Sequence, residues 1–190
     1  MMPGMVNRKR RADVFVDDAD DPRPEPPTRG DERETLVGFL RWQRATLELK
    51  CSGLGPRDLA RRSVEPSTMS LLGLVRHMAD IERGWFRQFM AGEDVPRLFN
   101  SPEDPDGDFD GAVADEEVVA EAWSAWRAEI AFADRFVAEQ PDLDVVGKRE
   151  DQWRGPLSLR WVLAHMIEEY ARHNGHADLL RERIDGRTGQ

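Results

Sequence analysis

Four stretches of this sequence repeat apolar residues at intervals of three and four, the spacing that gives a helix one buried face. They cover, in order, residues 31–52, 67–91, 116–139 and 158–184. Ser67, Thr68 and Ser70 are alternative N-caps of the second stretch. We find no convincing strand pattern, so the sequence predicts an all-α fold, a four-helix bundle. The long segment between the second and third helices contains three prolines and is compatible with a crossover connection.

The rest of the chain divides into a bundle domain and two flanking segments. Residues 1–30 are rich in proline and charge and poor in apolar side chains, which predicts a disordered or loosely attached N-terminal arm. Residues 31–186 form the predicted bundle, and residues 187–190 form a short tail.

Charge and composition exclude several classes of partner. The net charge is −10, which disfavours binding to nucleic acid or to an anionic membrane. The sequence contains no run of about 18 apolar residues that would cross a membrane. The single cysteine, Cys51, excludes an internal disulfide and a cysteine-based zinc site. We therefore expect a cytoplasmic protein that acts on a small-molecule substrate.

Three of the four histidines lie within twelve residues on the fourth helix. At about 100° per residue, His165, Glu169, His173 and His176 lie within roughly 60° of one direction, together with apolar side chains. Charged and polar groups on a buried face need compensation, and a divalent metal ion supplies it. Glu169 and His173, one helical turn apart, would chelate one ion together with His77 from the second helix.

Other arrangements of these side chains are open at this point. His173 and His176 are three residues apart and would also chelate, as would His165 with Glu169, four residues apart. The histidines would otherwise be core residues, with Glu169 paired to Arg172 or another arginine. Nitrogen and oxygen donors suit zinc first, with nickel, iron(II) or manganese as alternatives.

Two segments of the sequence resemble the DinB superfamily of metal-binding four-helix bundles. They are Leu72-Gly73-Leu74-Val75-Arg76-His77-Met78-Ala79-Asp80, followed by Glu82-Arg83, and Glu169-Tyr170-Ala171-Arg172-His173-Asn174-Gly175-His176-Ala177-Asp178. The resemblance covers about residues 34–186 and is nearest to the mini-circle-protein branch. Many members carry a His-x-x-x-His pair, whereas this chain has Glu169 in place of the first histidine. That departure matches the His, Glu, His set of the similar mycothiol-dependent maleylpyruvate isomerases, and the resemblance implies His77, Glu169 and His173 as metal ligands.

The resemblance also implies a reaction class. Relatives of known activity use the metal to activate a low-molecular-weight thiol, which predicts S-transfer or thiol-assisted isomerisation of a small electrophile. His165 or His176 is the expected general base, and Arg76 and Arg172 are candidate clamps for a substrate carboxylate. Homodimers occur in the family, although no feature of this sequence demands one. The alternative from another class is a non-catalytic bundle that binds a small molecule or a partner chain.

One acidic loop carries a different signal. Residues 106–117 fit the pattern of an EF-hand calcium loop, D-x-D-x-D-G followed by a glutamate. Prolines before the loop oppose the entering helix of an EF-hand, and no second hand is present in the sequence. Calcium binding is therefore a separate hypothesis for this loop.

Overall fold

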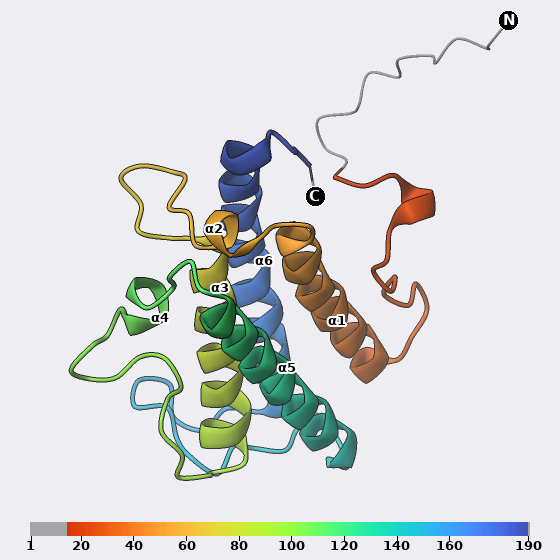
Figure 1. The fold of residues 1–190 in the computed structure, drawn as a ribbon. Coiled ribbons are helices and arrows are strands. Elements are labelled where there is room, and N and C mark those ends of the chain that lie inside the picture. Colours follow the sequence, from red (N-terminus) through yellow and green to blue (C-terminus); the bar gives the residue numbers. More distant parts are fainter. Residues whose placement is uncertain (1–14, 190) are drawn as a thin grey trace, which may run out of the picture.

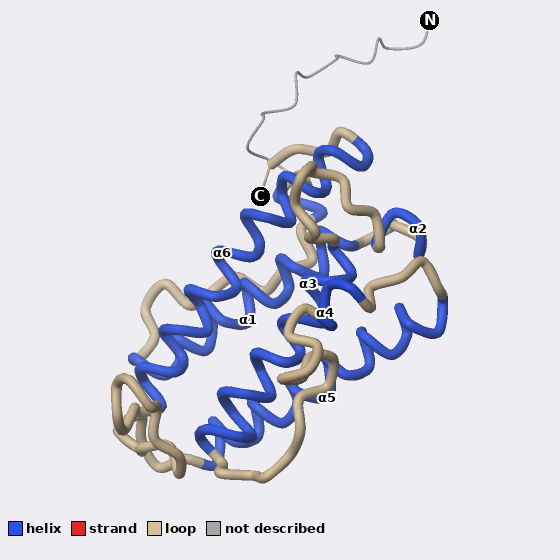
Figure 2. Tube along the Cα trace, turned by 90° about the vertical axis from the view of Figure 1, so that its left-hand side faces the viewer, coloured by secondary structure: helices blue, strands red, loops and turns tan. Residues whose placement is uncertain are grey.

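The computed structural model describes residues 15–189, and this part of the chain consists of helices and loops without a β-strand (Figures 1 and 2). The predicted all-α bundle is confirmed. Its long helices are α1 (Glu32–Cys51), α3 (Leu71–Glu82), α5 (Glu116–Glu139) and α6 (Leu159–Asp185). The short ones are η1 (Asp18–Asp20), α2 (Pro56–Leu59) and α4 (Gly107–Asp110). None of the helices described is long and apolar enough to span a membrane.

Side chains at the helix ends explain where the helices begin and stop. Asp31 and Glu34 form a capping box at the start of α1. Ser70 accepts a hydrogen bond from the Gly73 amide, so the last of the three candidate caps is the one used. Ser158 caps α6, which ends at Gly186 with a left-handed φ of 77° that glycine adopts without strain.

The last turns of the second long helix differ from an ordinary α-helix. After Glu82 the chain continues as a π-helical segment, η2 (Arg83–Met90). The Ala91 amide bonds to the Phe86 carbonyl, five residues back. π-Helical turns are wider than α-helical ones and often occur at functional sites. Trp85, in this segment, contacts the histidine cluster described below.

Contacts along the bundle show that α1 runs parallel to α6 and that α3–η2 runs parallel to α5. Arg160 near the start of α6 pairs with Glu32 at the start of α1, and Arg181 near the end of α6 bonds to the Lys50 carbonyl. Between α3–η2 and α5, Arg83 pairs with Glu129, and Arg87 lies 3.9 Å from the centre of the Phe132 ring. Since η2 and α5 run the same way, residues 91–115 return along the bundle before α5 begins (Figure 1).

A buried polar network joins the four long helices. Arg44 of α1 makes two hydrogen bonds of 2.7 Å to the Glu82 carboxylate of α3. The Tyr170 hydroxyl of α6 donates to the same carboxylate at 2.8 Å and accepts from the Trp126 indole of α5 at 2.9 Å. Glu82 and Tyr170 are fully buried. Because the charge of Glu82 is paired and its hydrogen bonds are made, its burial is compensated.

Two side chains of the N-terminal segment, residues 15–30, contact the bundle. Phe15 is fully buried, with the Lys50 ammonium group 4.0 Å from the centre of its ring. Arg23 donates to the Thr46 hydroxyl at 3.0 Å and lies over the Trp42 ring. The disordered or loosely attached arm over residues 1–30 stays a prediction; in its described part, residues 15–30, Phe15 and Arg23 have partners on α1. Residues 1–14 lie outside the described part of the chain.

Candidate functional site

Helices α3 and α6 bring the predicted ligand residues together. The rings of His77 on α3 and His173 on α6 meet edge to face, with centroids 4.8 Å apart. The Glu169 carboxylate lies one turn before His173, with 3.5 Å between its Oε2 and the histidine Nε2. Two imidazoles and one carboxylate from two helices therefore share one region of the bundle, half-buried and within reach of solvent.

A carboxylate from the acidic loop holds the His77 ring. The Nδ1 atom of His77 lies 2.7 Å from Oδ2 of Asp108, which is 3 % exposed. The Phe109 ring covers the same imidazole, with centroids 5.3 Å apart. His77 is thus fixed by a buried partner on one ring nitrogen, and its other nitrogen, Nε2, has no partner among the described residues.

The electrostatics of the cluster favour neutral imidazole at His173. Burial, followed by the neighbouring His77 and His176, lowers the pKa of His173 to about 4. A neutral imidazole has a lone pair free for a metal ion, and a ligand that must first lose a proton binds less readily at neutral pH. The surroundings of His173 therefore suit coordination.

The two candidate bases flank this pair on α6. His165 stacks on Trp161 and lies edge-on to Trp85, and its Nε2 is 3.3 Å from Oε1 of Glu169. His176 lies on the other side, with its Nδ1 3.4 Å from Nδ1 of His173. The structure thus places both histidines beside the predicted ligands.

The two candidate arginine clamps have different surroundings. Arg76 is 7 % exposed and donates to the backbone carbonyls of Gly107 and Asp108 at 3.0 and 2.9 Å. Its guanidinium group also stacks on Phe99, so it holds the loop rather than facing a cavity. Arg172 is exposed and pairs with Glu168 on the surface of α6.

Three successive turns of α3 anchor the loop that carries Asp108. Gly73 leaves room for Phe109, whose ring lies 2.7 Å from the position that a Cβ atom would take. Arg76 binds the carbonyls of α4, as described above. Asp80, fully buried, accepts the backbone amides of Leu98 and Phe99 at 2.6 and 2.9 Å. Since positions 73, 76 and 80 share one helical face, this face fixes the loop relative to His77.

A cleft of about 600 Å³ opens beside His77. The same loop forms its walls, and its polar lining residues include Arg97, Asn100, Ser101 and Asp106. The volume is in the range of small-molecule sites. Of the histidine cluster, His77 lines this cleft, together with Asp108.

The calcium-like loop does not gather its carboxylates around one point. Asp108 faces His77, while Asp110 pairs with the exposed Arg62 at 2.6 Å. A short helix, α4, occupies the centre of the pattern where an EF-hand has an extended loop. In this structure the acidic segment supports His77 through Asp108, and calcium binding stays a separate hypothesis.

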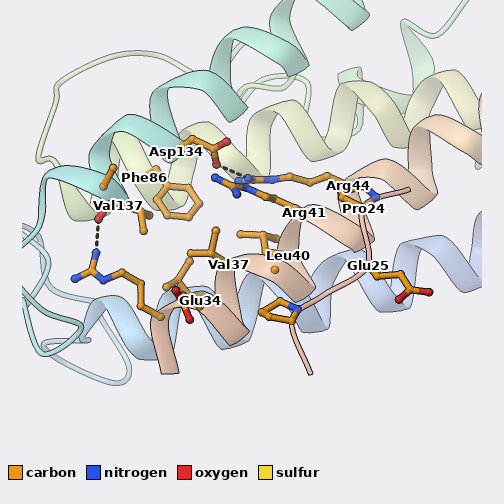
Figure 3. A pocket seen from close by; sticks show the side chains of 15 residues that line it. Pro24, Glu25, Glu34, Val37, Leu40, Arg41, Arg44, Phe86, Asp134 and Val137 are labelled. Carbon is orange, nitrogen blue, oxygen red and sulfur yellow. Dashed lines mark hydrogen bonds and ion pairs between the residues drawn. The ribbon is translucent and has the colours of Figure 1, made fainter. Parts of the chain in front are cut away.

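A second hollow lies away from the histidines. This cavity of about 480 Å³ lies between the N-terminal segment, α1 and α5, with Phe86 and Leu163 also lining it (Figure 3). The ion pair between Arg44 and Asp134 forms part of its wall. Its lining contains no histidine or cysteine, so this cavity is not the predicted metal site.

The chain's own thiol is buried and, within the described part of the chain, forms no hydrogen bond with the histidine cluster. Cys51 is 4 % exposed at the end of α1, and burial raises its pKa to about 12. A thiol in such surroundings stays protonated and is a poor nucleophile. Any thiol reacting at the histidine cluster would therefore come from outside the chain.

The residues at the cluster fit a divalent metal ion by their chemistry. His77, His173 and Glu169 offer the two nitrogen donors and one oxygen donor typical of a three-ligand catalytic site. As their side chains stand, no three His, Cys, Asp or Glu groups within residues 15–189 surround a common point that could hold an ion. The His77 and His173 rings are in contact and Glu169 lies beside His173, but binding one ion would require these side chains to rearrange.

Fold and site together define a DinB-like helical bundle with a histidine–carboxylate cluster between two of its helices. The model of one family, mycothiol-S-transferase, matches residues 35–186, about four-fifths of the chain. The chain belongs to this family. No match was found among curated proteins.

Sequence reasoning missed Asp108 as the partner of His77, and Asp80 and Gly73 as anchors of the loop. Asp80 has Ala79 and Ile81 beside it in sequence, but its own helical face carries Arg76, His77 and Arg83, so the signal of a buried carboxylate was weak. Asp108 carried no such signal, because its partner is 31 residues away along the chain.

Proposed function

We propose that this protein is a divalent-metal-dependent transferase that activates a low-molecular-weight thiol, mycothiol or a close analogue, and transfers it to a small electrophile. Thiol-assisted isomerisation is the related reaction that the same site would support. The observation that carries the proposal is the contact between His77 and His173 from two helices, with Glu169 beside it. Membership of the mycothiol-S-transferase family supports the thiol and the transferase class.

In this proposal His77, Glu169 and His173 hold the ion. A bound divalent ion lowers the pKa of a coordinated thiol, so that the reactive thiolate exists at neutral pH. The cleft beside His77 would orient the electrophile through hydrogen bonds from Asn100 and Ser101, both of which line it.

Either of two histidines would act as the general base that accepts the thiol proton. His176 lies beside His173 and His165 beside Glu169, so each is one side chain away from the proposed ligands. A neutral imidazole at either position would accept a proton through its unprotonated ring nitrogen. Arg172, on the surface of the same helix, would attract a substrate carboxylate, whereas Arg76 supports the cleft by holding its wall. A cytoplasmic location and a homodimer stay predictions.

Cobalt substitution tests the proposal. Protein loaded with Co²⁺ should show a new near-ultraviolet thiolate absorption when a low-molecular-weight thiol is added, because a thiolate would then bind the ion. His173→Ala should lose this response, and Cys51→Ala should keep it, since the responding thiol is the added one. A cobalt spectrum that thiols do not change would contradict the thiol role and favour a non-catalytic binding module.

A further inference from the structure

The acidic loop offers one carboxylate to the proposed metal site from the side opposite α6. Asp108 is nearly fully buried, and its Oδ2 atom lies 2.7 Å from the Nδ1 atom of His77. Its other carboxylate oxygen, Oδ1, accepts the Phe109 amide at 3.0 Å. Both oxygens are thus engaged, and among the described residues no arginine or lysine forms a close ion pair with this carboxylate, which Arg76 attracts only at longer range.

A carboxylate facing an imidazole nitrogen sets the tautomer of the ring. An ionised carboxylate only accepts hydrogen bonds, so with Asp108 ionised the proton between them sits on Nδ1 of His77. In a neutral imidazole the other nitrogen, Nε2, then holds the lone pair. Metal-binding histidines in proteins are commonly oriented in this way by a carboxylate outside the coordination sphere.

The surrounding contacts fix Asp108 at this place. Arg76 holds the carbonyls of residues 107 and 108, and a Cβ atom at Gly111 would lie 2.5 Å from the Arg76 guanidinium, so this close approach needs glycine. Phe109 packs into the space left by Gly73 and against the His77 ring. These contacts leave the Asp108 carboxylate little freedom to turn away from His77.

From this geometry we infer that Asp108 is a positioning residue, which holds His77 in the Nδ1–H tautomer and presents Nε2 to the metal ion. The inference rests on the proposed function, because it assigns His77 as a ligand. It also gives a role to the aspartate-rich loop that resembles a calcium site: the loop delivers one carboxylate to His77. Asp108 touches neither the ion nor the substrate in this account.

The tautomer can be measured without any metal. In the metal-free wild type at about pH 8, where an ordinary histidine is neutral, ¹⁵N-detected spectra should show His77 as the Nδ1–H form. Asp108→Ala should shift His77 toward the Nε2–H form, which free neutral histidine prefers. A wild-type His77 in the Nε2–H form would overturn the inference whatever the metal affinity.

Metal affinity supplies the second measurement. Asp108→Asn keeps the size of the side chain, and its amide accepts or donates equally well, so it removes the constraint on the tautomer while preserving the packing. We expect its affinity for Zn²⁺, measured by competition with a chelator, to fall about 10–100-fold. Asp110→Asn makes the same change of charge in the same loop, at a residue that pairs with exposed Arg62, and should stay within about twofold of the wild type.

The outcomes separate this inference from the proposed function. If the wild type binds Zn²⁺ and His77→Ala abolishes binding, but Asp108→Asn binds as tightly as the wild type, Asp108 is only structural and the inference fails alone. A fall in the melting temperature of Asp108→Asn without a fall in affinity has the same meaning. A wild type that binds no Zn²⁺ would overturn the metal site and the inference together.

Discussion

Replacing Tyr170 by phenylalanine removes the hydroxyl at the centre of the buried network. That hydroxyl donates to Glu82 at 2.8 Å and accepts from the Trp126 indole at 2.9 Å, and Tyr170 is fully buried. Phenylalanine fills nearly the same volume, so the substitution leaves no sizeable cavity. Its effect should come from the two lost hydrogen bonds.

The expected destabilisation follows from which groups lose a partner. The Trp126 N–H becomes an unpaired buried donor, which costs about 1–3 kcal/mol, and the Glu82 carboxylate keeps its two bonds from Arg44 but loses a third. We expect the free energy of unfolding to fall by about 2–4 kcal/mol. For a domain of this size the melting temperature should fall by roughly 5–15 °C.

Urea unfolding of four proteins tests this reasoning: the wild type, the two single variants and the double variant. Trp126→Phe removes the indole N–H, so in this background Tyr170→Phe leaves no buried donor unpaired. Tyr170→Phe should therefore lower the free energy of unfolding by about 1–2 kcal/mol less in the Trp126→Phe background than in the wild type. Equal costs in both backgrounds would refute the account of the network. So would a cost below about 0.5 kcal/mol for Tyr170→Phe alone.

Three further predictions concern other parts of the fold. Because burial raises the pKa of Cys51 to about 12, the folded chain keeps a proton that the unfolded chain releases above about pH 8.5. The free energy of unfolding should therefore fall between pH 8 and pH 10, by about 1–2 kcal/mol more in the wild type than in Cys51→Ala. Equal losses in the two proteins would contradict this. Gly73→Ala should lower the free energy of unfolding by about 1–3 kcal/mol, since its Cβ atom would lie 2.7 Å from Phe109, and an unchanged urea midpoint would show that the loop adapts freely. Asp80→Asn should speed hydrogen exchange at the Leu98 amide about 10–100-fold through the loss of a charge-assisted hydrogen bond; exchange at the wild-type rate would contradict that role.

The helices could be predicted because their signals are local. The capping box at Asp31, the serine before α6 and the glycine after it each act within a few residues, and the predicted third helix has the bounds that the structure gives α5. The π-helical geometry of η2 was not predictable, because the apolar spacing of its sequence also suits an ordinary α-helix. Phe15 escaped prediction because one apolar residue among prolines and charges carries no periodic signal.

The candidate site was predictable where its residues share one helix. The contact between Glu169 and His173 follows from their spacing of four, and the structure has it. The approach of His77 to His173 depends on how α3 packs on α6, so sequence spacing alone left it open among several pairings. The contact between Asp108 and His77 depends on how a long loop packs against α3, and the residues around Asp108 in the sequence suggested calcium binding instead.

The metal content of the protein tests the central claim most directly. Protein purified without a nickel column and measured by elemental analysis should contain about one zinc, nickel, iron or manganese ion per chain. His77→Ala and Glu169→Gln should each lose that ion, while Asp110→Asn keeps it. A wild type that is folded, metal-free and unable to take up any of these ions would contradict the proposed metal site.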